Sequence, residues 1–233
     1  MTNHYTCCGR VKSKREEDNE KNKFFKCSLK GVKYRIMSFK VFDMYDMGEV
    51  KVKDMALVPY INLSDRLLIK SHGRNIGKFT QAKMHILERL ANRIAVSGHS
   101  GRKHKIITSH SSGKYGRNMQ TVIEAMTIIF ERKKTNPVQL VVQAIENASP
   151  RDETTTIEYG GARYPQAVDV SPLRRVNLAV RWLVQGSYQR CFGKKKKMAE
   201  SLAQEIINAA DMNMESYALS KKNEAEKQAD SAR

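Results

Sequence analysis

The chain has 233 residues, and its 42 Lys or Arg against 24 Asp or Glu give a formal net charge of +18 and an isoelectric point near 9.8. Because a compact chain with this charge repels itself, the composition disfavours a catalytic domain that lacks a polyanionic partner. A hydrophobic content of 40% excludes wholesale disorder, and no apolar run approaches the roughly 20 residues of a membrane span.

Residues 1–33 are polar and charged and show no sustained period, which predicts a flexible, basic N-terminal arm that becomes ordered only on a partner. They also contain no apolar core of a secretory signal, so we expect a cytosolic chain. Residues 34–233 are expected to form a single domain. Its first part, up to about Ser64, has only scattered extended signals, and no regular element is predicted there.

The first helix is predicted to begin near Ala82, where apolar residues start to recur at helical spacing. These residues are Ile86, Leu87, Leu90 and Ile94. Arg89 and Arg93 are expected on the surface of this helix. Residues 98–118 are rich in Gly, Ser and basic residues and predict a long exposed loop.

A second helix is predicted over 119–130 and a third from Pro137, a residue suited to a first helical turn, to about Ser149. Alternating residues on both sides of Gly160-Gly161 predict a β-hairpin over 154–170. Ser171-Pro172 is typical of a helix start, so a fourth helix is expected to run from there to Gly186. A fifth helix begins at 197, and residues 213–233 are expected to form a frayed helix or a polar tail.

The predicted fold class is therefore mainly α: a helical bundle domain with a protruding β-hairpin arm and a flexible basic N-terminal arm. The expected scaffold core combines six apolar residues from different helices: Ile86, Leu90, Met126, Val141, Val180 and Leu183. Trp182 and Cys191 are interpreted as packing residues.

Two windows of the chain are strongly basic. Residues 70–123 hold eleven Lys or Arg against one acid, Glu88, and residues 170–199 hold eight against none. Arg174 and Arg181 are two helical turns apart and share a face. Such clustering predicts an anionic partner, and backbone phosphates suit it through counterion release. A membrane surface is disfavoured because Trp182 lies on the packing side, and RNA is favoured over duplex DNA because a hairpin and loops protrude.

Catalytic and metal sites find no support in the residue patterns. Neither Gly77-Lys78 nor Gly113-Lys114 is followed by Ser or Thr, so both fail as phosphate-binding loops. The sequence has no G-x-S-x-G run and no suitable pair of carboxylates, so no enzyme is predicted. The cysteines lack metal-binding spacings and are expected to be free thiols, so neither a metal nor a cofactor is predicted. They are Cys7, Cys8, Cys27 and Cys191.

The segment 136–187 resembles a known family in residue types and spacing. The resemblance rests on Asn136-Pro137, the turn at Pro150-Arg151, the run QAVDVSP at 166–172 and Arg174-Arg175. The family is ribosomal protein seven of the small subunit, called protein five in eukaryotes. Similar residues extend the resemblance to about 40–233, and VDVSPLRRVN is similar to the eukaryotic and archaeal branch. Residues 98–118 depart from the family, which has a shorter basic turn there.

The resemblance implies a structural constituent of the small ribosomal subunit whose hairpin projects as an arm. It implies binding to the 3′ major domain of the small-subunit rRNA, a role in head assembly, and a place near the mRNA exit path and the exit-site tRNA. Neighbouring head and platform proteins would be further partners, with mRNA and tRNA as transient ones. A cytosolic ribosome is implied, with passage through the nucleolus in a eukaryote. The alternative is a free RNA-binding or ribosome-assembly factor.

The candidate RNA-binding residues combine phosphate-neutralising cations with one aromatic side chain. They are Arg74, Lys78, Arg93, Arg117, Arg151, Arg163, Tyr164, Arg174, Arg175, Arg181, Lys194, Lys195, Lys196 and Lys197. Near tRNA or mRNA we expect Tyr159, Gly160, Gly161, Arg163 and Arg233. At the hairpin turn, Tyr159 and Tyr164 either stack on unpaired bases or pair with each other across the strands, and the sequence leaves both open.

Overall fold

The computed structural model describes residues 40–42, 44–64, 68, 77, 80–98 and 111–233, all within one compact unit, Phe39–Arg233. The arm predicted at 1–33, Arg74 and Lys78 lie outside the described residues. The described elements are η1 (Val58–Tyr60), η2 (Thr80–Lys83), α1 (Ile86–Ile94), α2 (Tyr115–Lys133), α3 (Pro137–Ala148), β1 (Asp152–Tyr159), β2 (Ala162–Asp169), α4 (Pro172–Cys191), α5 (Met198–Ala210) and α6 (Tyr217–Ser231). The predicted class, mainly α with one antiparallel hairpin, is confirmed.

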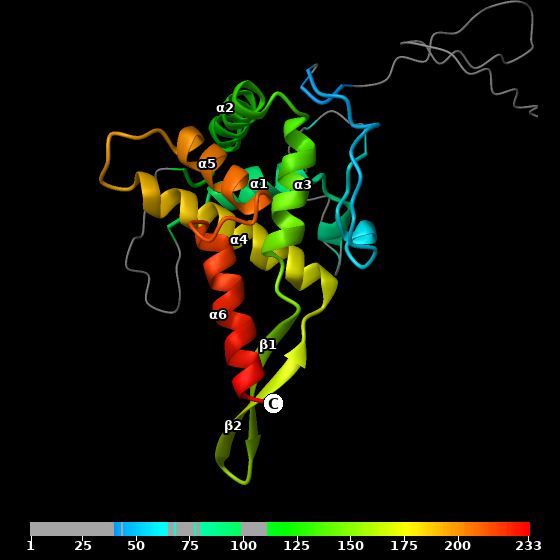
Figure 1. Cartoon of the computed structure of the whole chain (residues 1–233), viewed down its shortest axis with the longest axis vertical. Helices are drawn as coiled ribbons and strands as arrows, with labels where there is room; N and C mark the ends of the chain where they lie inside the picture. Colours follow the sequence, from blue (N-terminus) through cyan, green and yellow to red (C-terminus); the bar gives the residue numbers. More distant parts are fainter. Residues whose placement is uncertain (1–39, 43, 65–67, 69–76, 78–79, 99–110) are drawn as a thin grey trace, which may run out of the picture. The chain divides into compact units, whose positions relative to one another are not determined.

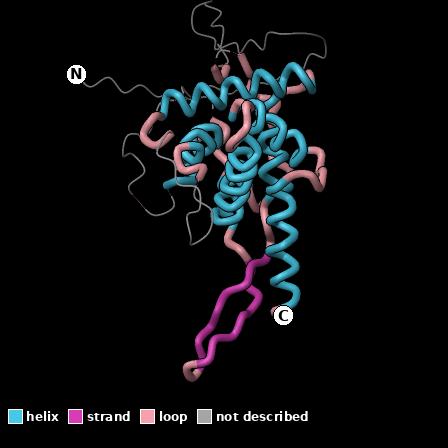
Figure 2. Tube along the Cα trace, turned by 90° about the vertical axis from the view of Figure 1, so that its left-hand side faces the viewer, coloured by secondary structure: helices cyan, strands magenta, loops and turns pink. Residues whose placement is uncertain are grey.

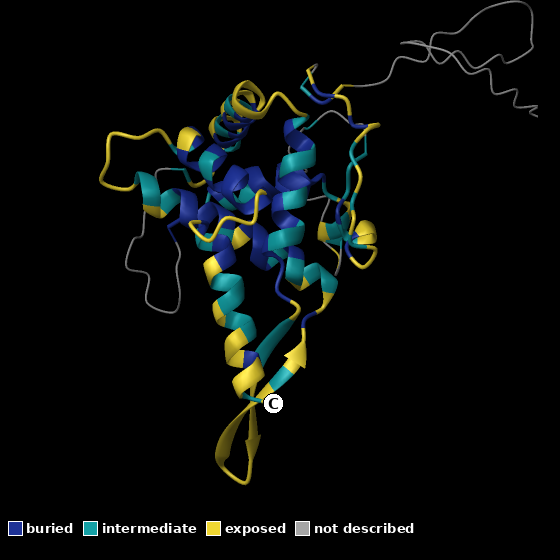
Figure 3. Ribbon diagram, viewed as in Figure 1, coloured by how far each residue is buried: buried dark blue, intermediate teal, exposed yellow. Residues whose placement is uncertain are grey.

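Helices α1 to α5 gather into a bundle, and the hairpin projects from it (Figure 1). α5 packs against α2, α3 and α4, while α6 leaves the bundle beside β1, so the C-terminus lies next to the hairpin (Figure 2). Buried residues concentrate where the helices meet (Figure 3). The six residues predicted to form the core are all buried there: Ile86, Leu90, Met126, Val141, Val180 and Leu183.

The predicted helix starts at proline are confirmed. The side chain of Asn136 accepts a hydrogen bond of 3.1 Å from the backbone N–H of Val138, so one of the free N–H groups of the first turn is satisfied. Ser171 occupies the N-cap position of α4, although its side chain makes no capping bond.

The predicted end of the fourth helix at Gly186 is wrong, because α4 continues to Cys191. Gly186 lies inside the helix, at the point where the start of α6 crosses it. A Cβ atom at this position would lie only 2.7 Å from the Cβ of Tyr217. Glycine is therefore required here for close helix packing, and a glycine that permits close approach looks in sequence like one that ends a helix.

The structure also defines two segments for which the sequence predicted a loop or a frayed end. The predicted loop at 98–118 ends too late, because α2 begins at Tyr115 and Asn118 is already buried in its first turn; residues 99–110 lie outside the described part. Of the two forms predicted for residues 213–233, a frayed helix or a polar tail, the structure shows the helix, α6, from Tyr217 to Ser231. Ser216 caps its first turn by accepting a hydrogen bond from the N–H of Leu219, and packing against α4 and β1 supports a helix whose own apolar face is narrow.

The β-hairpin is confirmed, with strands slightly different from those predicted. Gly160 and Gly161 form its two-residue turn, and both have positive φ, 58° and 84°, which glycine adopts without strain. Tyr164 lies opposite Ile157, and Tyr159 lies opposite Ala162. The two tyrosines are therefore diagonal neighbours across the strands rather than a directly opposed pair, a spacing that aromatic side chains can still bridge, so both interpretations stay predictions. Both side chains are exposed, at 81% for Tyr159 and 60% for Tyr164.

His85 caps the start of α1 with its imidazole ring. Its Nδ1 accepts a hydrogen bond of 3.2 Å from the N–H of Leu87, and burial lowers the pKa of His85 from 6.5 to about 4. The folded protein thus holds a neutral imidazole over a pH range in which the unfolded chain would be protonated.

We expect the contribution of His85 to the free energy of unfolding to be complete above pH 6.5. It should decrease as the pH drops from 6.5 towards 4, because the unfolded state then binds an additional proton. His85→Asn keeps a capping acceptor but removes the titrating group. Denaturant unfolding across this pH range should show a shallower pH dependence in the variant than in the original chain. Equal slopes would contradict the assignment.

Candidate nucleic-acid interface

Three of the predicted RNA-binding arginines form ion pairs within the protein. Arg174 binds Glu153 through two hydrogen bonds of 2.6 and 2.7 Å, and Arg163 binds Glu158 at 2.6 Å. Arg175 lies 2.9 Å from Asp54, a residue 121 positions away in sequence. The acid-free window at 170–199 therefore receives carboxylates from other parts of the chain.

These ion pairs differ in their exposure to solvent, and the exposure decides whether an arginine can leave its carboxylate for another anion. The side chain of Arg175 is 11% exposed, whereas that of Arg174 is 56% exposed. An exposed ion pair contributes little stability, so a phosphate can compete for its arginine. Arg175 is largely covered and also lies 3.3 Å from the hydroxyl of Ser149, which makes it a link between α4 and the segment before the bundle.

Eight predicted cations have no ion-pair partner among the described residues. Seven of them are exposed, and Arg93 is half-buried. The eight are Arg93, Arg117, Arg151, Arg181, Lys194, Lys195, Lys196 and Lys197. The four lysines follow each other directly in the connection between α4 and α5, so this connection presents an uninterrupted positive surface.

A hollow of about 430 Å³ brings two of these cations together. It lies where the starts of α2 and α5 meet the end of α1, and its lining includes Arg117, Lys197 and Ile94. Residues 80 positions apart in sequence thus contribute to one basic surface, and the lysine run continues it. The polar side chains of Gln120 and Glu124 lie on the same lining.

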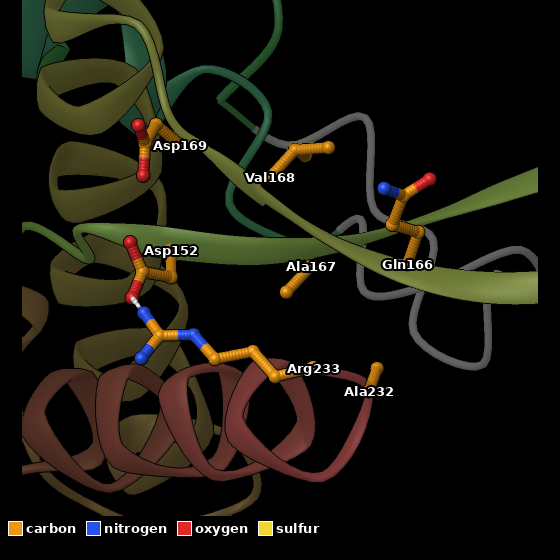
Figure 4. A pocket seen from close by; sticks show the side chains of 7 residues that line it. All are labelled: Asp152, Gln166, Ala167, Val168, Asp169, Ala232 and Arg233. Atoms are coloured by element: carbon orange, nitrogen blue, oxygen red, sulfur yellow. Dashed lines mark hydrogen bonds and ion pairs between the residues drawn. The ribbon is translucent and has the colours of Figure 1, made fainter.

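The residues predicted near tRNA or mRNA fall at two different places. Tyr159, Gly160, Gly161 and Arg163 lie at the free end of the hairpin. Arg233 instead lies at its base, where it reaches from the end of α6 to Asp152 at 2.8 Å (Figure 4). The strands between these places span roughly 25 Å, at about 3.3 Å per residue.

Two arginines with structural roles were missed or misplaced by the sequence analysis. Arg89 was expected on the surface but is buried, and it donates hydrogen bonds of 2.8 Å to the carbonyl of Tyr60 and to Oδ1 of Asn177. Burial lowers its pKa to about 10. Arg190 lies 3.1 Å from the fully buried carboxylate of Glu205. No local signal distinguishes these arginines from exposed ones, because their partners lie far away in the chain.

In the part of the chain that the structure describes, no group of three or more His, Cys, Asp or Glu is arranged to hold a metal ion. No helix within it is long and apolar enough to cross a membrane. Cys191 carries a free thiol whose pKa is raised by burial; the other three cysteines lie outside this part.

We expect Arg175→Gln to affect mainly the stability of the protein and Lys196→Gln to affect mainly its binding to RNA. Loss of Arg175 leaves Asp54 without its partner in a mostly covered pair and should lower the free energy of unfolding by about 2 kcal/mol. Loss of the exposed Lys196 should leave stability unchanged and weaken RNA binding. Thermal unfolding and RNA filter binding measure the two effects, and a stability loss in Lys196→Gln would contradict this division.

Comparison with known proteins identifies the family. The family model described as ribosomal protein S7p/S5e matches residues 66–233. The small ribosomal subunit protein uS7 of Nanoarchaeum equitans is 48% identical over 198 residues, which cover 84% of this chain and 100% of that protein. The uS7 proteins of Methanothermobacter thermautotrophicus and Methanosphaera stadtmanae are 43% and 41% identical, over 82% and 84% of this chain and 98% and 100% of their own lengths. The resemblance seen in the sequence is thus confirmed: the chain belongs to the ribosomal protein S7p/S5e family of structural, non-enzymatic ribosome components.

Proposed function

We propose that this chain is a structural constituent of the small ribosomal subunit that binds the 3′ major domain of the small-subunit rRNA and supports assembly of the head. The observation that carries the proposal is the surface of exposed cations without ion-pair partners among the described residues, formed by Arg117, Arg181 and the run from Lys194 to Lys197. Such a surface suits the backbone of a folded RNA, whose phosphates it would neutralise with release of counterions.

Arg163 and Arg174 would join this surface by exchanging partners. Each is paired with one glutamate on an exposed face, and each pair is open to solvent. An RNA phosphate offers a guanidinium the same bidentate geometry as a carboxylate. We therefore expect these two arginines to contact RNA in the particle, whereas Arg175 serves mainly to hold the fold.

The hairpin would act as an arm that reaches the mRNA exit path and the exit-site tRNA. Its free end is exposed on both strands, and it carries two exposed tyrosines and Arg163 beside the glycine turn. Aromatic and guanidinium planes stack on unpaired bases. Arg233 would contribute from the base of the arm, and Arg74 and Lys78 would contribute to rRNA binding from the segment before α1.

Neighbouring head and platform proteins would complete the set of partners, with mRNA and exit-site tRNA as transient ones. The site of action would be the cytosolic ribosome, reached through the nucleolus in a eukaryote. The second candidate is a free RNA-binding or ribosome-assembly factor, because a basic surface of this kind also suits a protein that exchanges on and off RNA.

Sedimentation of native lysate through sucrose gradients separates the two candidates. We expect the chain in the small-subunit peak at about one copy per particle, both at low and at high salt, because contacts enclosed by folded RNA are screened less than those of a loosely bound protein. Movement to the top of the gradient at moderate salt would favour the exchanging factor and contradict the structural role.

Replacing Arg163 and Tyr164 together by alanine should impair translation without unfolding the protein, because both side chains are exposed near the end of the arm. Translation in reconstituted small subunits and thermal unfolding of the isolated chain measure the two effects. Thr155→Ala with Gln166→Ala, an exposed opposed pair nearer the base, is the matched control. Unfolding of the Arg163 and Tyr164 variant would contradict the arm function.

A further inference from the structure

Helices α1 and α4 pack against each other. At the first level, Arg89 of α1 donates a hydrogen bond of 2.8 Å to Oδ1 of Asn177 on α4. Four residues further along each helix lie Arg93 and Arg181. The first level therefore pairs a cation with an acceptor, whereas the second brings together two cations.

The arginine of the second level differs from Arg89 in its hydrogen bonds. The Nε of Arg93 is buried and has no hydrogen-bond partner in the part of the chain that the structure describes. Arg89, by contrast, uses its two terminal nitrogens on Tyr60 and Asn177. The pKa of Arg93 is lowered by burial and, to a smaller extent, by the positive charge of Arg181.

The acid of α1 lies on a different side of the helix from Arg93. Glu88 precedes Arg93 by five residues, which places it about 140° around the helix. Its charge acts on Tyr115 at the start of α2, where burial and then Glu88 raise the pKa of the phenol to about 12. Two arginines are thus held close together with an unused buried donor, an arrangement that an anion would stabilise.

We propose that Arg93 and Arg181 form one binding site for a single phosphodiester group of the RNA backbone. The inference rests on the proposed RNA-binding function and names the ligand of one part of that surface. A phosphate oxygen would accept the free Nε–H of Arg93, and the exposed guanidinium of Arg181 would bind another oxygen. The same anion would remove the repulsion between the two cations.

This site differs in kind from the lysine run. The lysines are exposed, flexible point charges that follow the RNA backbone without fixed geometry. Arg93 and Arg181 are positioned by two packed helices, and the bond between Arg89 and Asn177 one turn earlier fixes how these helices cross. The arginine pair would therefore set the register of the RNA, whereas the lysines would add affinity.

Inorganic sulfate is a probe for this site in the isolated full-length chain. Thermal unfolding is measured in sodium sulfate and in sodium chloride at equal ionic strength. Sulfate also stabilises proteins in general, and this effect on Tm increases with concentration without saturation. A rise in Tm that saturates therefore indicates a binding site. We expect this rise in the original chain and in Lys195→Gln, and its loss in Arg93→Gln and Arg181→Gln. If Arg93→Gln is destabilised, Arg181→Gln still tests the site, because Arg181 is exposed and its replacement should not disturb the fold. A rise retained in both arginine variants, or lost in Lys195→Gln as well, would overturn the proposal.

A double-mutant cycle with a transcript of the 3′ major domain distinguishes this site from the proposed function. If one phosphate is shared, Arg93→Gln and Arg181→Gln should each weaken binding roughly tenfold, and the double variant should lose little more. Arg181→Gln combined with Lys195→Gln should show losses that multiply. A roughly hundredfold loss in the arginine double variant would mean two separate contacts and overturn the shared site. Failure of the original chain to bind the transcript would instead contradict the proposed function, while the sulfate result would still decide the site.

Discussion

The arrangement of the last three helices depends on one buried carboxylate. Glu205 of α5 is 0% exposed, and its Oε1 accepts hydrogen bonds from the hydroxyl of Ser216 at 2.7 Å and from the N–H of Ala218 at 3.1 Å. Arg190 of α4 lies 3.1 Å from the other oxygen. A buried charge without partners costs several kcal/mol, so α4, α5 and the start of α6 are stable only in this mutual position. Gly186 permits the close approach that the arrangement requires.

The hairpin arm depends in turn on α6. A two-stranded hairpin is at best marginally stable by itself, and the outer parts of both strands are exposed. Its base packs against α6, where Glu226 accepts a hydrogen bond from the N–H of Arg151 and Arg233 lies next to Asp152. The position of the arm is therefore set by contacts that begin at Glu205. This favours RNA binding, because an ordered arm loses less conformational entropy on binding than a flexible one.

The cations of the structure have two roles: some bind acceptors within the protein, and others are exposed to solvent. Arg89, Arg175 and Arg190 lie close to carbonyl or carboxylate oxygens from other elements and connect parts of the fold. The lysines between α4 and α5 are exposed and form no ion pair with the described residues. The cations without an ion-pair partner among the described residues are therefore the ones available to a ligand, and Arg93 with Arg181 lies between the two roles. Because some arginines are paired within the protein, fewer cations are available to contact RNA than the composition implies.

The sequence by itself determined the features that depend on neighbouring residues. The start of α3 at Asn136-Pro137, the Gly160-Gly161 turn and the apolar stripes of the helices follow from local capping, backbone freedom and helical period, and they were predicted correctly. The tertiary structure alone decided what Gly186 does, whether residues 217–231 form a helix, and which arginines stay available to a ligand. Asp54 reaches Arg175 across 121 residues. Because charge pairing and close packing depend on groups that only folding brings together, no local pattern contains them.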